Sequence, residues 1–224
     1  MRKYIVSALY RISSVAPKFF LRKIVFLCFV LMELAWYLLG RIDHMRMLRY
    51  RDETIDFVCA NIGSGERVLE IGPAEGYLSR KMIGKAGSLF GVEIDKRYYK
   101  DLKAIGDRRM RFVNDDIRTF PLEETFDAAV LVHVLEHIAS PEELLRKLSL
   151  HAKKLIIESP SEMDWWLERL RKDLKIPAWG DEHHAFSFNG QELKKILEEC
   201  GWRVVSIQEP VMLVRVVAAS NKLS

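Results

Sequence analysis

Short apolar runs alternate with amphipathic segments from residue 52 onward, and this alternation constrains the fold more than any other feature. Runs of strand length recur at residues 67–71, 88–93, 110–113, 126–132, 155–158, 202–207 and 211–217. Helix-like segments separate most of them, which is typical of a parallel sheet covered by helices on both faces. We therefore predict an α/β fold with a seven-stranded, mostly parallel sheet. The last two strands are expected to form an antiparallel pair.

Local sequence marks where two of the helices begin. Ser140 precedes Pro141, which suits the first helical position, and Glu143 completes a capping-box pattern. Asn189 and Glu192 repeat the pattern without a proline. Further helices are predicted over residues 52–61, 77–83 and 96–105. With these helices assigned, the polar motifs between them fall at the ends of strands.

The N-terminal part of the chain differs from the rest in charge and hydropathy. Residues 1–51 carry ten Lys/Arg and two Asp/Glu, a net charge of +8, so the remaining residues carry −4. Positions 24–39 contain one charge, Glu33, and are otherwise apolar on every face of a helix. We therefore divide the chain into a basic, hydrophobic helical arm, residues 1–50, and an α/β domain, residues 51–224.

Three interpretations of the apolar stretch remain open. As a helix it would be about 24 Å long, slightly short of the roughly 30 Å hydrocarbon core of a bilayer. It could nevertheless span a membrane, or pack as a buried helix on the domain or on a second subunit. We favour a helix at the membrane interface, because its basic flanks would then face anionic headgroups. An anionic membrane surface, contacted through residues 1–51, is thus an expected partner.

Cysteine usage and charge limit the compartment and the partners. Cys28, Cys59 and Cys200 are widely spaced and odd in number, so no zinc site, other metal site or disulfide framework is indicated. The acidic domain makes a nucleic-acid substrate unexpected, because phosphate binding needs Lys and Arg along the site. We expect a protein of the cytoplasm or of the cytoplasmic face of a membrane.

The stretch VLEIGPAEGY, residues 68–77, follows the first predicted strand into a turn of small residues. Gly72, Ala74 and Gly76 alternate with larger residues, and Glu70 precedes the first glycine by two positions. Small residues let a ligand approach the backbone closely. Because open parallel sheets bind ligands at the carboxyl ends of their strands, this turn is a candidate nucleotide-binding site.

Acidic residues end the next two strands. Glu93 lies 23 residues after Glu70, at a spacing where a carboxylate can accept both hydroxyls of a ribose. Asp95 could take this role if the register differs by two residues. After the third strand, the Asp116 carboxylate can accept from the exocyclic amine of adenine, and Ile117 can offer its backbone amide. Together these residues predict an adenosine-containing ligand.

Four histidines are candidate general bases, since imidazole can take a proton near neutral pH. His133 and His137 belong to the segment HVLEH after the fourth strand, and His183 and His184 belong to GDEHHAFSF before a late helix. A structural role is the alternative for each of them. In the long connection between residues 161 and 182, tryptophans could line an acceptor pocket or pack in the core; these are Trp165, Trp166 and Trp179.

Taken together, the motifs resemble those of the class I S-adenosylmethionine-dependent methyltransferases. The resemblance is closest to the group whose small-molecule members methylate quinones, lipids, sugars and secondary metabolites. It spans about residues 50–217 and rests on the ordered set of motifs at residues 68–77, 91–95, 115–121, 126–138 and 183–202. It implies a Rossmann-like seven-stranded sheet and S-adenosylmethionine as the cofactor, with S-adenosylhomocysteine as the product.

The resemblance also implies roles for individual residues. Around the methionine portion of the cofactor it places Glu70, Gly72 and Gly76; on the ribose, Glu93; and at the adenine, Asp116 and Ile117. Ala74 is a departure, because the family pattern usually has glycine there. The implied activity is methyl transfer to a small-molecule, lipid, quinone or glycan acceptor, near a membrane surface if the arm binds one.

Other functions remain as alternatives. A dinucleotide-dependent oxidoreductase is disfavoured, because its G-x-G-x-x-G motif would place the final glycine one residue later. A catalytically silent cofactor-binding or membrane-tethered module stays open, since fold alone does not establish activity. Protein methylation is a further alternative for the acceptor.

Overall fold

The computed structural model describes residues 44–161, 188–210 and 213–223, together with positions 23, 26, 27, 30 and 31. The chain divides into two units, Met1–Arg49 with Asp164–Glu182, and Tyr50–Met163 with His183–Ser224. The second unit holds the whole sheet. Among the described residues, no helix has the length and apolar character needed to cross a bilayer. Most of the apolar stretch 24–39 lies outside the described residues.

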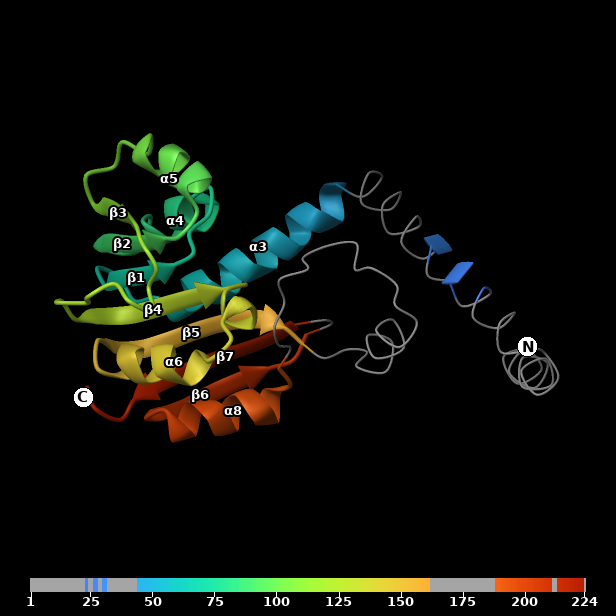
Figure 1. Cartoon of the computed structure of the whole chain (residues 1–224). Helices are drawn as coiled ribbons and strands as arrows, with labels where there is room; N and C mark the ends of the chain where they lie inside the picture. The colour runs from blue at the N-terminus through green and yellow to red at the C-terminus, as the bar shows by residue number, and fades with distance from the viewer. Residues whose placement is uncertain are drawn as a thin grey trace. The chain divides into compact units, whose positions relative to one another are not determined.

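Seven strands form a mixed sheet of order β3-β2-β1-β4-β5-β7-β6 (Figure 1). The strands are β1 (Arg67–Ile71), β2 (Ser88–Glu93), β3 (Met110–Asn114), β4 (Phe126–Val132), β5 (Ala152–Pro160), β6 (Trp202–Gln208) and β7 (Leu213–Ser220). The strands β1 to β5 pair in parallel, whereas β7 lies antiparallel between β5 and β6. The predicted sheet and its final antiparallel pair are thus confirmed.

Helices cover both faces of the sheet, as expected. The described helices are α3 (His44–Asn61), α4 (Tyr77–Met82), α5 (Lys96–Lys103), the 3-10 turn η1 (Leu135–His137), α6 (Pro141–Ser149) and α8 (Gly190–Glu199). Apolar residues of α3 and α4 pack in one core cluster, and those of α6 and α8 in the other. Helix α3 begins at His44, eight residues before the predicted start at residue 52.

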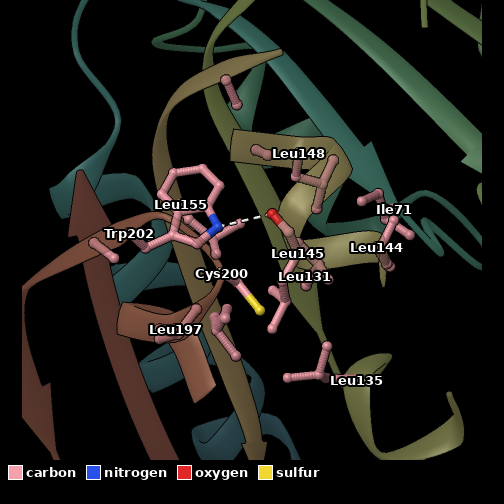
Figure 2. Packing of buried hydrophobic residues seen from close by; sticks show 14 of the residues in the cluster. Ile71, Leu131, Leu135, Leu144, Leu145, Leu148, Leu155, Leu197, Cys200 and Trp202 are labelled. Atoms are coloured by element: carbon pink, nitrogen blue, oxygen red, sulfur yellow. Dashed lines mark hydrogen bonds between the residues drawn. The ribbon is translucent and has the colours of Figure 1, made fainter. Parts of the chain in front are cut away.

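The core cluster beneath α6 and α8 is built from leucines around one tryptophan (Figure 2). Trp202 is fully buried, and its indole Nε1 donates a 2.9 Å hydrogen bond to the Leu145 carbonyl. This bond satisfies the only polar atom of the indole, so the ring can be buried without leaving a donor unpaired. Cys200 lies in the same cluster as a free, buried thiol, while Cys59 is partly buried.

One of the two capping predictions is confirmed and the other is wrong. The Asn189 side chain accepts from the Glu192 amide at 2.9 Å, and Glu192 reaches back to the Asn189 amide. The Ser140 side chain makes no capping hydrogen bond, although Pro141 does begin the helix. The ψ angle is 163° at Asn189 and 77° at Ser140, so the backbone enters α6 from a different direction than α8. The capping box at Ser140 is therefore absent.

Candidate active site

The turn after β1 depends on a buried acid that the surrounding residues hold in place. Glu70 is 3% exposed, and Ser79 Oγ of α4 donates to its Oε2 at 2.5 Å. Burial raises the pKa of Glu70 to about 7; the bond from Ser79 opposes this shift, and the charge of Glu93 adds to it. A nearby cation would stabilise the ionised form of a carboxylate buried in this way.

The backbone of the turn uses left-handed conformations at three positions. The φ angles are 68° at Gly72, 48° at Ala74 and 73° at Gly76. A Cβ on Gly72 would lie 2.8 Å from Val134 Cγ2, so the absence of a side chain brings the β1 turn against the segment after β4. Ala74 holds a conformation that glycine adopts at lower cost. The position that departs from the family pattern is therefore also strained.

Glu93 joins the ends of β1 and β2. Its Oε2 accepts from the Ala74 amide at 2.9 Å, and its Oε1 accepts from the Asp95 amide at 2.8 Å. Each carboxylate oxygen keeps a second lone pair that can accept from a ribose hydroxyl. Asp95 instead caps α5, where its side chain accepts from the Arg97 amide at 2.8 Å. Of the two acids, Glu93 is the one beside the β1 turn.

The loop after β3 is held from two sides. Asp116 pairs with the Arg118 guanidinium at 2.6 Å, and this bond keeps the pKa of Asp116 below its ordinary value. Lys147 of α6 donates to the carbonyls of Ile117, at 2.7 Å, and Phe120. The role of Lys147 was not predicted, because a lysine 30 residues away gives no local signal that it reaches this loop.

His133 follows β4 in a left-handed conformation, with φ 53°. Its ring lies between two carboxylates, with Nδ1 3.4 Å from Glu136 Oε1 and Nε2 3.4 Å from Glu158 Oε1. Burial of the ring works against its charged form, but the two carboxylates outweigh this effect and raise the pKa of His133 to about 9. The ring is therefore protonated at neutral pH and is a poor general base in this state.

Glu158 and Arg215, which the sequence did not reveal as site residues, complete this cluster. The two residues face each other across the β5–β7 pairing, and Arg215 Nε donates to Glu158 Oε2 at 2.6 Å. Thr54 Oγ1 of α3 donates to Glu158 Oε1 at 2.7 Å. Charged residues within the apolar runs LIIESP and VMLVRVV were the available signal.

Of the other candidate bases, only His137 lies within the described residues. His137 lies in η1 with an exposed side chain. His183 and His184 lie outside the described residues, as do the three tryptophans of the long connection.

The strand order arranges the candidate residues in a line along the carboxyl edge of the sheet. Asp116 and Ile117 follow β3, Glu93 ends β2, and the Gly72 turn follows β1. These strands are neighbours in the order β3-β2-β1. Adenine, ribose and methionine are connected in this same order in S-adenosylmethionine, so the donors, the acceptors and the glycine turn fit that cofactor. His133 lies one strand further on, after β4.

A seven-stranded sheet of this order, with an acid before the β1 turn and another at the end of β2, defines a class I S-adenosylmethionine-dependent methyltransferase. The family comparison agrees with this classification. A model of the methyltransferase domain matches residues 41–207, well over half of the sequence, and the chain belongs to this family.

Individual relatives are more distant. The mitochondrial ubiquinone biosynthesis O-methyltransferase of Schizosaccharomyces pombe is 25% identical over 164 residues, which cover 66% of this chain and 59% of that protein. The chain thus spans less than two thirds of this relative.

Solved structures share the fold. A chain of the complex between the Haloferax volcanii Trm112 methyltransferase activator and a methyltransferase has a TM-score of 0.64 and 13% identity, covering 83% of this chain and 96% of its own length. Magnesium protoporphyrin IX methyltransferase from Synechocystis PCC 6803, solved with bound S-adenosylhomocysteine, has a TM-score of 0.59 and 18% identity, covering 76% and 83%.

Proposed function

We propose that this protein transfers a methyl group from S-adenosylmethionine to a small-molecule acceptor. The observation that carries the proposal is the row of residues along three neighbouring strand ends, in the order expected for contacts with the adenine, the ribose and the methionine portion of the cofactor. The names of two similar proteins, a ubiquinone biosynthesis O-methyltransferase and a magnesium protoporphyrin IX methyltransferase, support a small-molecule acceptor. Quinone, lipid and glycan acceptors all belong to this class.

In this proposal the chain itself contributes positioning and electrostatics. When bound, the cofactor supplies an electrophilic methyl group on a sulfonium cation. Glu93 would accept from the ribose hydroxyls, the loop of Asp116 and Ile117 would contact the adenine, and the carboxylate of Glu70 would favour the nearby positive charge. The β1 turn around Gly72 would lie beside the methionine portion. Methyl transfer is an in-line displacement, so holding the two reacting atoms in line and away from water is the main task.

Incubation of the purified full chain with methyl-labelled S-adenosylmethionine and cell extracts tests the reaction. Label is expected in an organic-soluble or small-molecule fraction, and Gly72→Ala should abolish it because the added Cβ would clash with Val134 and strain the positive φ of the turn. Label confined to protein would favour protein methylation instead. If the cofactor binds but no fraction is labelled, the alternative of a catalytically silent binding module is supported.

We further propose that the arm brings the reaction to an anionic membrane surface on the cytoplasmic side. The support is the net charge of +8 over residues 1–51 and the half-exposed side chains at four helical positions with i, i+4 spacing: Phe26, Leu27, Val30 and Leu31. Flotation with anionic liposomes should carry the full chain upward, and deletion of residues 1–40 should abolish this. A full chain that stays at the bottom at low salt would contradict the membrane role.

A further inference from the structure

His133 combines an uncommon backbone with a place beside the β1 turn. Residues other than glycine adopt positive φ rarely, and those that do are frequent at functional sites. The His133 amide donates to the Glu158 carbonyl at 2.9 Å, which ties this backbone to β5. The next residue, Val134, contacts the space that a Cβ on Gly72 would occupy. His133 therefore lies next to the turn proposed to hold the methionine portion, on its β4 side.

Glu158, one of the two carboxylates beside the ring, has closer partners than His133. Glu158 accepts from Arg215 at 2.6 Å and from Thr54 at 2.7 Å, so its 3.4 Å approach to His133 Nε2 is the longest of its three contacts. Charge-assisted N–H···O bonds are usually about 2.7–2.9 Å long. Nε2–H is therefore a loosely engaged donor on a ring whose side chain is 48% exposed.

Glu136 faces the other ring nitrogen from η1. It is fully buried, and Ser159 Oγ donates to its Oε2 at 3.1 Å. Its Oε1 has no hydrogen-bond partner among the described residues, and His133 Nδ1 lies 3.4 Å from it. A buried carboxylate oxygen left without a donor is costly, so it strongly favours a protonated His133.

We propose that His133, protonated at neutral pH, binds the deprotonated oxygen of a phenol-type acceptor and does not act as a general base. This inference rests on the proposed methyltransferase function and names its substrate class. In this arrangement Nδ1–H faces Glu136 and Nε2–H donates to the acceptor oxygen. Glu158 continues to accept hydrogen bonds from Thr54 and Arg215. The charged groups facing the ring are Glu136 from η1 and Glu158 from β5, with Arg215 of β7 behind Glu158.

The chemistry explains why the acceptor is a phenol. Free phenols have a pKa near 10, close enough to neutrality for one adjacent cation to favour the ionised form, whereas aliphatic hydroxyls are far less acidic. The hydroxyl proton leaves to water as the acceptor binds. An oxygen lone pair then forms the O–C bond while the S–C bond breaks and its electron pair remains on sulfur. His133 keeps its proton throughout, and an amine acceptor would gain nothing from it.

Nuclear magnetic resonance of the full chain with labelled histidine tests the charge directly. The resonance that disappears in His133→Asn identifies the ring, and asparagine tolerates the left-handed backbone. Because the carboxylates favour the charged form, the ring should titrate near pH 9, and Glu136→Gln should lower this midpoint by at least one pH unit. A midpoint near the ordinary 6.5 in the wild type would overturn the proposal.

A chromophoric phenol tests what the cation binds. The full chain, loaded with S-adenosylhomocysteine, is mixed with 4-nitrophenol at a pH below the probe's own pKa. The wild type should produce the phenolate absorbance band, and His133→Asn should lose it. His151→Asn is the matched control, because His151 precedes β5 at the amino end of the strands, and it should keep the band. Absence of the band in wild type, or an equal band in His133→Asn, would overturn the proposal.

The methyltransferase function and the cationic role of His133 fail separately. If calorimetry shows no binding of S-adenosylhomocysteine, the proposed function fails, whatever the state of His133. If the cofactor binds and methyl transfer occurs while His133 titrates near 6.5, only the cationic role fails, and His133 is then available as a general base.

Discussion

Gly72 is the residue on which the candidate site most depends. Alanine there would face two separate penalties, the positive φ of 68° and the 2.8 Å approach of its Cβ to Val134. Strain of about 1–2 kcal/mol and overpacking of about 1–3 kcal/mol are typical of such changes. We predict that Gly72→Ala lowers the free energy of unfolding by about 2–5 kcal/mol, measured by urea denaturation, and abolishes cofactor binding.

Two further variants separate these causes. Adding Val134→Ala to Gly72→Ala should recover the loss of unfolding free energy that is due to the contact with Val134. The loss that is due to the positive φ should remain. Ala74→Gly removes the strain of a positive φ in the same turn. Glycine also raises the conformational entropy of the unfolded chain, which offsets much of this stabilisation, so the free energy of unfolding should change by less than about 1 kcal/mol. Equal losses in the single and double variants would show that contact with Val134 is unimportant.

Glu70 should make stability depend on pH. Its pKa in the folded state, about 7, lies above the ordinary 4.5, so the native protein binds the proton more tightly than the unfolded chain. The stabilising contribution is therefore complete below about pH 4.5 and is lost as the pH rises through about 7. We predict that Glu70→Gln reduces the loss of unfolding free energy between pH 5 and pH 8 by about 3 kcal/mol. Parallel pH profiles for variant and wild type in urea denaturation would contradict this.

Among single residues, those in motifs were predictable and long-range partners were not. Glu70, Gly72 and Glu93 follow apolar runs within one segment each, so their strand-end positions can be seen in the sequence. The charged state of His133 depends on Glu158, which reaches it only when β4 and β5 pair. A histidine in a sequence suggests a base, and only the neighbouring carboxylates make this one a cation.

Among the elements, α6 and α8 offer a matched test of capping. We predict that Asn189→Ala lowers the free energy of unfolding by about 1 kcal/mol, because the Asn189 side chain accepts from the Glu192 amide. Ser140→Ala should change it by less than about 0.5 kcal/mol, because Ser140 makes no capping bond. Chemical denaturation measures both, and a larger effect at Ser140 would contradict the described start of α6.

The antiparallel insertion of β7 brings Arg215 beside Glu158. Breaking a buried ion pair by removing one partner typically costs about 3–5 kcal/mol. We predict a loss of this size in unfolding free energy for Arg215→Met, since Glu158 is fully buried and would lose its closest donor. The double variant with Glu158→Gln should be less destabilised than Arg215→Met alone. A purely additive double variant would show that the two side chains are not coupled.

Element types were predicted more successfully than their contacts. Hydropathy period, flanking glycines and capping residues indicated the strands and the α-helices of the domain, but not η1, because these signals are local. The capping box at Ser140 was wrong because the sequence pattern does not specify the ψ angle of 77° that the chain adopts there. The position of β7 between β5 and β6 depends on pairing across the whole sheet, which no single segment encodes.

For the molecule as a whole, strand order turns separate motifs into one site. Motifs that lie up to 45 residues apart in sequence, from Gly72 to Ile117, meet along one edge because β3, β2 and β1 are neighbours. This part of the site was predictable from the resemblance. His183 and His184, which were predicted on the acceptor side, lie outside the described residues, so their role stays a prediction.

Calorimetric titration of the full chain with S-adenosylmethionine is the decisive test of a cofactor site along these strand ends. Hydrogen bonds to a charged group are worth about 1.5–3 kcal/mol each, and 1.4 kcal/mol corresponds to a tenfold change in affinity. We predict that the wild type binds the cofactor, that Glu93→Ala weakens binding by at least about tenfold, and that Asp101→Ala, which removes an exposed acid of α5, leaves it unchanged. No binding to the wild type, or equal affinity in wild type and a folded Glu93→Ala, would contradict a cofactor site at this edge of the sheet.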